Sequence, residues 1–273
     1  MSGLIDISKP TRSSIPRPTR EQLCEVIQIL WRLSQEFIHD LEKGTHVDKF
    51  SGACISVGTS NLKAMVELLP AYLAESGNVL RNLVETTVDF FWVESVLEKD
   101  KIIGERLVRN FFLFADYKNI QMGPTFLSII ENDHFFRDIK DLFTEKQTLD
   151  KSRLRVGSIK FGKTWRHENG FLPGKDVQWK KRCELAADFV QRHMNLKSAP
   201  YLKNLENLSS FSHFDPLQII MMHPKVFERT FDRNLNIGLG FIYDMVMFIH
   251  TKRSWKPSNE LGGLQHRFLW FPN

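Results

Sequence analysis

The chain has 273 residues, of which 42% are apolar and 25% are charged, a composition typical of globular proteins. Its three cysteines, Cys24, Cys54 and Cys183, lie far apart with no CxxC spacing. This pattern suggests neither a disulfide framework nor a zinc site, and it fits a reducing cytoplasm. The N-terminus lacks a signal-peptide pattern, and the most apolar late run, 237–249, is short and carries Asp244, so we expect no membrane span.

The net charge of +5 is unevenly distributed along the chain. Residues 151–182 hold ten Lys/Arg and only two acidic residues, a local charge of +8, and subtracting this from the total leaves −3 for the rest. The basic character therefore belongs to one segment.

The N-terminal residues 1–18 are rich in Ser, Pro and Arg, which predicts a mobile arm. Thr19 then precedes a helix with Gln22 three residues later, the arrangement of a capping box, and Gly44 can end this helix. In the next helical region, residues 61–75, Pro70 predicts a kink, and Ser76-Gly77 predicts a break between this region and the helix that follows. Further helices are predicted over residues 61–75, 78–99, 101–121, 125–146, 176–194, 201–213 and 224–252.

Strand patterns are scarce, and only residues 153–164 alternate as a small hairpin would. We therefore predict an all-α fold: a single multi-helix bundle over residues 19–252, with a basic loop or hairpin excursion at 151–182. Residues 253–273 are predicted to be an irregular C-terminal tail.

The helix around residues 79–97 is apolar nearly all round, as in a helix at the centre of a bundle. Asn82, Thr86 and Asp89 form its narrow polar strip. Arg81 and Glu85 lie off that strip, four residues apart, and we expect them to form a buried ion pair. Because burying two charges is expensive, stability alone explains such a pair poorly. Two interpretations of the pair stay open: it clamps two helices together, or it lines a functional cleft.

A second polar cluster lies on the predicted helix 201–213, whose inward face is defined by leucines. Ser209, Ser212 and His213 fall on this same face. Buried hydroxyl and imidazole groups need partners, and Arg81 and Glu85 have the matching character. Either neighbouring hydroxyls satisfy His213, or it lies in a cleft where it titrates near neutral pH beside an arginine.

Two stretches of sequence resemble a known family. "SGNVLRNLVETTVDFFWVES" resembles the RxxxE helix of a bacterial helical family, domain of unknown function 5677, and "KTWRHENG" with "YLKNLENLSSFSHFDP" resembles its Trp-containing loop and LSxxxH helix. The resemblance covers roughly residues 50–220 and depends on motif order more than on a rare signature. The positions that match are Arg81, Glu85, Trp165, Ser209 and His213.

The family has no settled activity, but its architecture is similar to that of HEPN domains, many of which are metal-independent RNases in toxin and phage-defence systems. HEPN catalysis uses an Arg followed by a His after four to six residues. The single string of this kind here, Arg32 to His39, is expected by chance. The resemblance implies instead catalysis by Arg81 and His213 from separate helices, with Glu85 orienting the arginine and Ser209 positioning His213 or a phosphate oxygen.

The basic segment suggests nucleic-acid contact, because its cations alternate with aromatic residues on which bases can stack. The alternative is a solvated loop that its tryptophans anchor to the body of the protein. The predicted nucleic-acid-binding residues are Lys160, Lys163, Trp165, Arg166, Lys180, Lys181 and Arg182.

Other site types are predicted less well by the sequence. "GSIKFGKT" (157–164) matches a P-loop string, yet no buried strand precedes it, and Gly170 and Pro173 oppose the helix that should follow. No GxSxG elbow supports a serine hydrolase, and the histidines lack HExxH spacing, so we expect no metal and no cofactor.

We therefore expect a bacterial cytoplasmic protein that acts on RNA, as a metal-independent RNase or a toxin or phage-defence module. The alternative is a non-enzymatic helical module that binds nucleic acid, a partner protein or a second copy of itself.

Overall fold

The computed structural model describes residues 19–41, 44–68, 73–132, 144, 164–167, 175–194 and 224–252. Regular structure in these residues is helical apart from one antiparallel bridge between His167 and Asp176, which confirms the all-α prediction. The predicted arm 1–18, the tail 253–273, helix 201–213, Pro70 and residues 153–163 of the expected hairpin lie outside the described residues.

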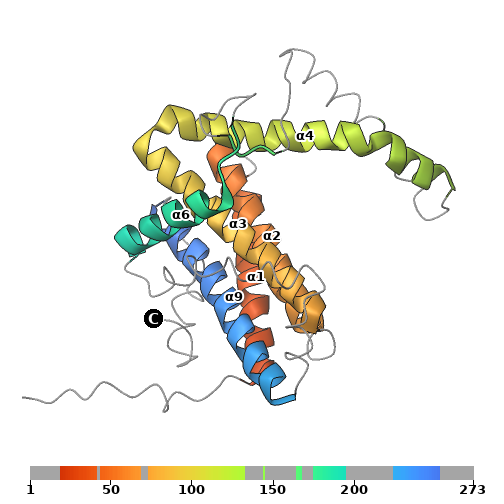
Figure 1. The fold of residues 1–273 in the computed structure, drawn as a ribbon, viewed down its shortest axis with the longest axis vertical. Coiled ribbons are helices and arrows are strands. Elements are labelled where there is room, and N and C mark those ends of the chain that lie inside the picture. The colour runs from red at the N-terminus through yellow and green to blue at the C-terminus, as the bar shows by residue number, and fades with distance from the viewer. Residues whose placement is uncertain are drawn as a thin grey trace, which may run out of the picture. The chain divides into compact units, whose positions relative to one another are not determined.

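Figure 1 shows the described helices in chain order. They are α1 (Arg20–Leu41), α2 (His46–Leu68), α3 (Leu73–Lys99), α4 (Lys101–Asn132), α6 (Trp179–Met194) and α9 (Pro224–Lys252).

Side-chain caps explain where three of these helices begin. The predicted capping box is present at α1, where Thr19 N donates to Gln22 Oε1 at 2.9 Å and Gln22 N donates to Thr19 Oγ1 at 3.3 Å. Thr45 and Asp48 form the same reciprocal pair at the start of α2, at 2.9 and 3.2 Å. Asp100 alone separates α3 from α4, and its Oδ1 accepts from the Ile103 amide at 3.0 Å.

Two predicted helix breaks are wrong. Ser76-Gly77 lies inside α3, where both residues are buried, so tertiary packing overrides the weak helix propensity of this pair. Gly123-Pro124 lies inside α4, which continues to Asn132. A proline removes one backbone hydrogen bond, and here the surrounding helix tolerates that loss.

The chain divides into two compact units, each assembled from segments distant in sequence. Among the described residues, the first unit contains α1, α2 from Gly52, α3 up to Thr87, and α9. The second contains the start of α2, α3 from Val88, α4, residues 164–167 and 175–178, and α6. Helices α2 and α3 thus contribute to both units.

In the first unit, α1, α2, α3 and α9 pack along one another (Figure 1). Gly58 of α2 marks a close approach: a Cβ there would lie 2.5 Å from Ile242 Cδ1 of α9 and 3.3 Å from Leu83 Cδ1 of α3. Ser34 of α1 and Thr59 of α2 share a buried hydroxyl contact of 3.3 Å. Glycine at position 58 lets these helices pack closely, and a larger residue there would require the end of the Ile242 side chain to move.

The core of the second unit is aromatic. The Trp165 ring is 6% exposed, and its centroid lies 5.8 Å from Phe50, 6.0 Å from Trp92 and 5.1 Å from Phe111. Aromatic pairs at these distances stabilise beyond the area that they bury. The short segment around Trp165 is therefore attached to α2, α3 and α4.

Two further observations concern the cysteines and the apolar character of the helices. Cys24, Cys54 and Cys183 all lie in described helices and form no disulfide. Among the described helices, none combines the length and the apolar character needed to cross a membrane.

Candidate nucleic-acid interface

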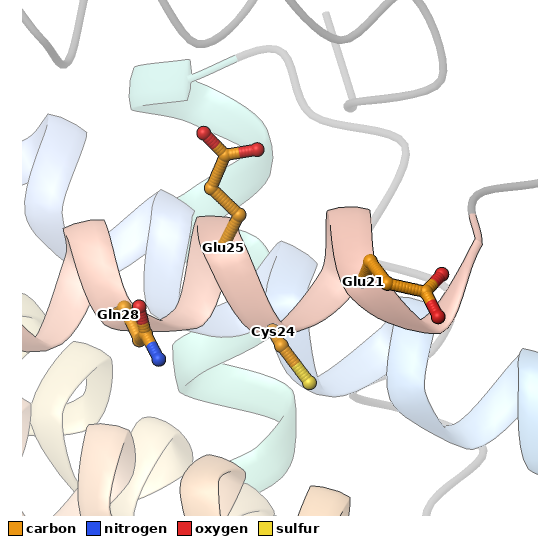
Figure 2. A pocket seen from close by; sticks show the side chains of 4 residues that line it. All are labelled: Glu21, Cys24, Glu25 and Gln28. Atoms are coloured by element: carbon orange, nitrogen blue, oxygen red, sulfur yellow. The ribbon is translucent and has the colours of Figure 1, made fainter.

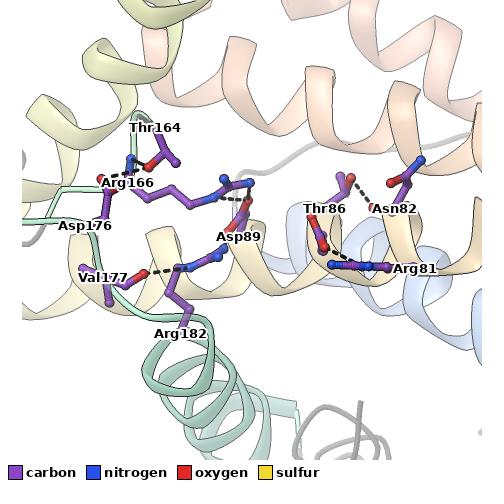
Figure 3. Close-up of polar contacts among 10 residues, drawn as sticks. Arg81, Asn82, Thr86, Asp89, Thr164, Arg166, Asp176, Val177 and Arg182 are labelled. Atoms are coloured by element: carbon purple, nitrogen blue, oxygen red, sulfur yellow. Dashed lines mark hydrogen bonds and ion pairs between the residues drawn. The ribbon is translucent and has the colours of Figure 1, made fainter. Parts of the chain in front are cut away.

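The second unit contains a buried carboxylate that two arginines share. Asp89 of α3 is 5% exposed. Arg166 donates to its Oδ2 from Nε at 2.8 Å and from Nη2 at 2.5 Å, and Arg182 Nη1 donates to its Oδ1 (Figure 3). Charge-assisted bonds to both carboxylate oxygens compensate for the burial of Asp89 and Arg182. We call these three residues the Asp89 cluster.

Arg182, in the first turn of α6, is held on several sides. Its side chain is 9% exposed, and its Nε donates to the Val177 carbonyl at 3.3 Å. Its guanidinium carbon lies 5.9 Å from the Trp92 ring centroid and 5.1 Å from that of Trp179. Burial lowers the pKa of Arg182, Asp89 opposes this shift, and Arg166 adds to it, with a net lowering. The guanidinium stays charged near neutral pH.

The segment around Arg166 is bound to residues 175–178 by backbone and side-chain bonds. The Val177 amide donates to the Arg166 carbonyl at 2.9 Å. Thr164 Oγ1 donates to Asp176 Oδ1 at 2.9 Å, and His167 Nδ1 lies 3.6 Å from the same oxygen. Residues 164–167 and 175–178 therefore lie together, and the Asp89 cluster attaches them to α3.

Three of the predicted nucleic-acid-binding residues lie near Asp89 in the structure. Trp165 is buried in the aromatic core and Arg182 is buried against Asp89. The Arg166 side chain is 23% exposed and is also bonded to Asp89. The tryptophan thus anchors the segment, as the alternative reading of this loop expected.

Among the described residues of this segment, the exposed cations are lysines. Lys175, Lys180 and Lys181 are exposed, and the last two directly precede Arg182. Of the other predicted contacts, Lys160 and Lys163 lie outside the described residues, as does all of the P-loop-like string except Thr164. The described part of the candidate interface therefore presents three exposed lysines on a backbone attached to Asp89.

Arg81 and Glu85 form the predicted pair in the first unit, with Arg81 Nε donating to Glu85 Oε1 at 3.0 Å. Each side chain is 36% exposed, so the expectation that the pair is buried is wrong. Both residues belong to α3, so this bond fixes a side chain within one helix and does not clamp two helices. Its predicted partners Ser209 and His213 lie outside the described residues.

Asp89 is the functional candidate that the sequence-based reasoning missed. The helical pattern places Asp89 on the narrow polar strip with Asn82 and Thr86, of which Asn82 is exposed and Thr86 is half-buried. The available signal was its setting between Val88 and Phe90-Phe91-Trp92, because a charge inside an apolar run of a central helix needs a buried partner.

A hollow of about 510 Å³ lies along α1 in the first unit and is lined by Glu21, Cys24, Glu25 and Gln28 (Figure 2). Its carboxylates would repel a phosphate, and no predicted site residue lines it. Among the described residues, no group of three or more His, Cys, Asp or Glu side chains is arranged to hold a metal ion.

Comparison with protein-family models, with curated proteins and with solved structures finds no match to this chain.

Proposed function

We propose that the chain is an RNA-binding helical protein whose basic segment, attached to α3 by the Asp89 cluster, forms the binding surface. The observation that carries this proposal is that Lys175, Lys180 and Lys181 stay exposed while the backbone bearing them is held in place. Ordered cations attract a polyanion and lose less conformational freedom on binding than cations on a free loop.

The position of two of these lysines supports the proposal. Lys180 and Lys181 lie in the first turn of α6, which contains no acidic residue. The N-terminal end of a helix already has a partial positive charge, so each cation there destabilises the helix by about 0.3–1 kcal/mol. Helix stability therefore does not explain the two lysines, whereas attraction of phosphate does.

RNA affinity tests this proposal directly. We expect Lys180→Gln/Lys181→Gln to weaken binding of a fluorescent single-stranded RNA at about 100 mM salt by roughly one order of magnitude, because each lost phosphate contact reduces counterion release. The control is Lys99→Gln/Lys101→Gln, which removes the same charge from two exposed lysines at the α3–α4 junction. Equal affinities of the two variants would refute a specific surface on α6.

RNA cleavage without metal is a second candidate, favoured by the geometry of Arg81. Glu85 holds its Nε at 3.0 Å while the side chain stays 36% exposed, so an oriented guanidinium is accessible from solvent. In this proposal Arg81 stabilises charge on the phosphorane, and His213, with Ser209, moves the protons. The resemblance to domain of unknown function 5677, and with it a bacterial cytoplasmic setting in defence or toxin systems, is part of this proposal.

The cleavage candidate is tested by incubating total RNA and tRNA with purified protein in excess EDTA. We expect cleavage by the wild type and loss of cleavage in folded Arg81→Ala and His213→Ala variants. RNA that stays intact with all three proteins would leave binding as the function.

A further inference from the structure

Asp89 is a buried acidic residue that holds the segment proposed to bind a polyanion. We infer that Asp89 is a positioning residue for RNA binding: it holds the exposed lysines in place, so its removal weakens binding although it removes a negative charge. This inference rests on the proposed function.

Stability alone gives a poor reason for the Asp89 cluster. Asp89 is 5% exposed and Arg182 is 7% exposed, and the desolvation of each ion opposes folding. Apolar side chains of similar volume at such positions are often neutral or stabilising. The cluster instead fixes the orientation of the segments that bear the two arginines, because a carboxylate accepts bonds from fixed guanidinium donors in few geometries.

The residues that the Asp89 cluster holds in place lie close to the exposed lysines in the sequence. Arg182 follows Lys181 in the first turn of α6, so the bond of Arg182 to Asp89 fixes the turn that carries both lysines of α6. Arg166 is bonded through its carbonyl to the Val177 amide, two residues after Lys175. Figure 3 shows both arginines converging on Asp89 from opposite ends of this segment.

Electrostatic attraction and positioning predict opposite signs for Asp89→Asn. The substitution raises the formal net charge from +5 by one unit, and charge alone would strengthen RNA binding. Loss of the bonds to Asp89 loosens the backbone that bears the lysines, so more conformational freedom is lost when RNA binds. Positioning therefore predicts weaker binding, by about 10-fold in Kd.

The experiment measures the Kd of fluorescent oligouridylate by anisotropy for the wild type, Asp89→Asn, Lys180→Gln/Lys181→Gln and the combined variant, with folding checked by circular dichroism. We expect Asp89→Asn to bind about 10-fold more weakly. We also expect the lysine substitutions to have a smaller effect in the Asp89→Asn background, because residues that act together are not additive. A general structural defect would not produce this non-additivity.

A second variant keeps the test valid if Asp89→Asn unfolds. Asp89→Leu/Arg182→Leu leaves the net charge unchanged and replaces buried ions with apolar groups, which usually preserves folding. It too is expected to bind about 10-fold more weakly.

Each outcome decides between the two claims. If either folded variant at Asp89 binds as tightly as the wild type, or more tightly, the positioning role is refuted and the proposed function stands. If the lysine variant binds as the wild type does, the proposed function fails and the positioning role fails with it.

Discussion

Truncation of Arg182 tests how strongly the Asp89 cluster attaches α6 to α3. In Arg182→Met the apolar stem is replaced by a side chain of similar length, while the guanidinium and its bonds to Asp89 and to the Val177 carbonyl are lost. Breaking a buried pair by removing one partner destabilises by about 3–5 kcal/mol. Because Arg166 still neutralises Asp89, we expect a loss of about 2–3 kcal/mol in the free energy of unfolding, below that range.

The matched control is Arg81→Met, which removes an arginine from the ion pair of α3 with Glu85. Both side chains of that pair are 36% exposed, so solvent screens it and the expected loss is only about 0.3–0.5 kcal/mol. Urea unfolding at pH 7, followed by far-ultraviolet circular dichroism, measures both variants, and tryptophan fluorescence reports the surroundings of Trp92 and Trp179. Equal unfolding midpoints for the two variants would refute the anchoring role of Arg182.

Two further predictions concern stability. Partial desolvation raises the pKa of Glu98, but hydrogen bonds from Arg192 at 2.9 Å and His193 at 2.6 Å outweigh it and lower the pKa overall. A lowered folded-state pKa contributes stability that is present above the unfolded pKa of about 4.3 and is lost as the pH falls through the folded value. In urea titrations from pH 6 to pH 3, Glu98→Gln should therefore lose stability less steeply on acidification than the wild type, and an unchanged slope would contradict the shift. A Cβ on Gly104 would lie 2.8 Å from Leu97 Cα, a backbone atom that cannot rotate away, whereas one on Gly240 meets nothing within 4 Å. We expect Gly104→Ala to destabilise by about 1–2 kcal/mol and Gly240→Ala to stabilise by up to about 1 kcal/mol, and the reverse order of thermal midpoints would count against this packing.

The helices were predictable where local signals determine them. The capping box at Thr19 is a local pattern, and the apolar periodicity of residues 224–252 predicted α9 with the ends that the structure has. The first half of α2 was missed because its glycines and serines form helices weakly, and its helical state depends on neighbours such as Ile242 that approach Gly58 closely. Packing between distant segments is not readable from local propensity.

The candidate site was predictable in composition but not in geometry. The charge of residues 151–182 indicated a basic surface, yet the sequence did not distinguish the arginines that Asp89 binds from the lysines that stay exposed. That distinction depends on a contact between residues 77 and 93 positions apart, Asp89 with Arg166 and with Arg182. Only the folded arrangement shows which cations are available to a ligand.

The salt dependence of RNA binding tests the proposed function most directly. The slope of log Kd against log salt counts phosphate contacts, at about 0.7 for each contact with a single strand. Removing Lys180 and Lys181 should reduce the slope by about 1.4, whereas removing Lys99 and Lys101 should leave it unchanged. The same slope in both variants, or no RNA binding by the wild type, would contradict the account.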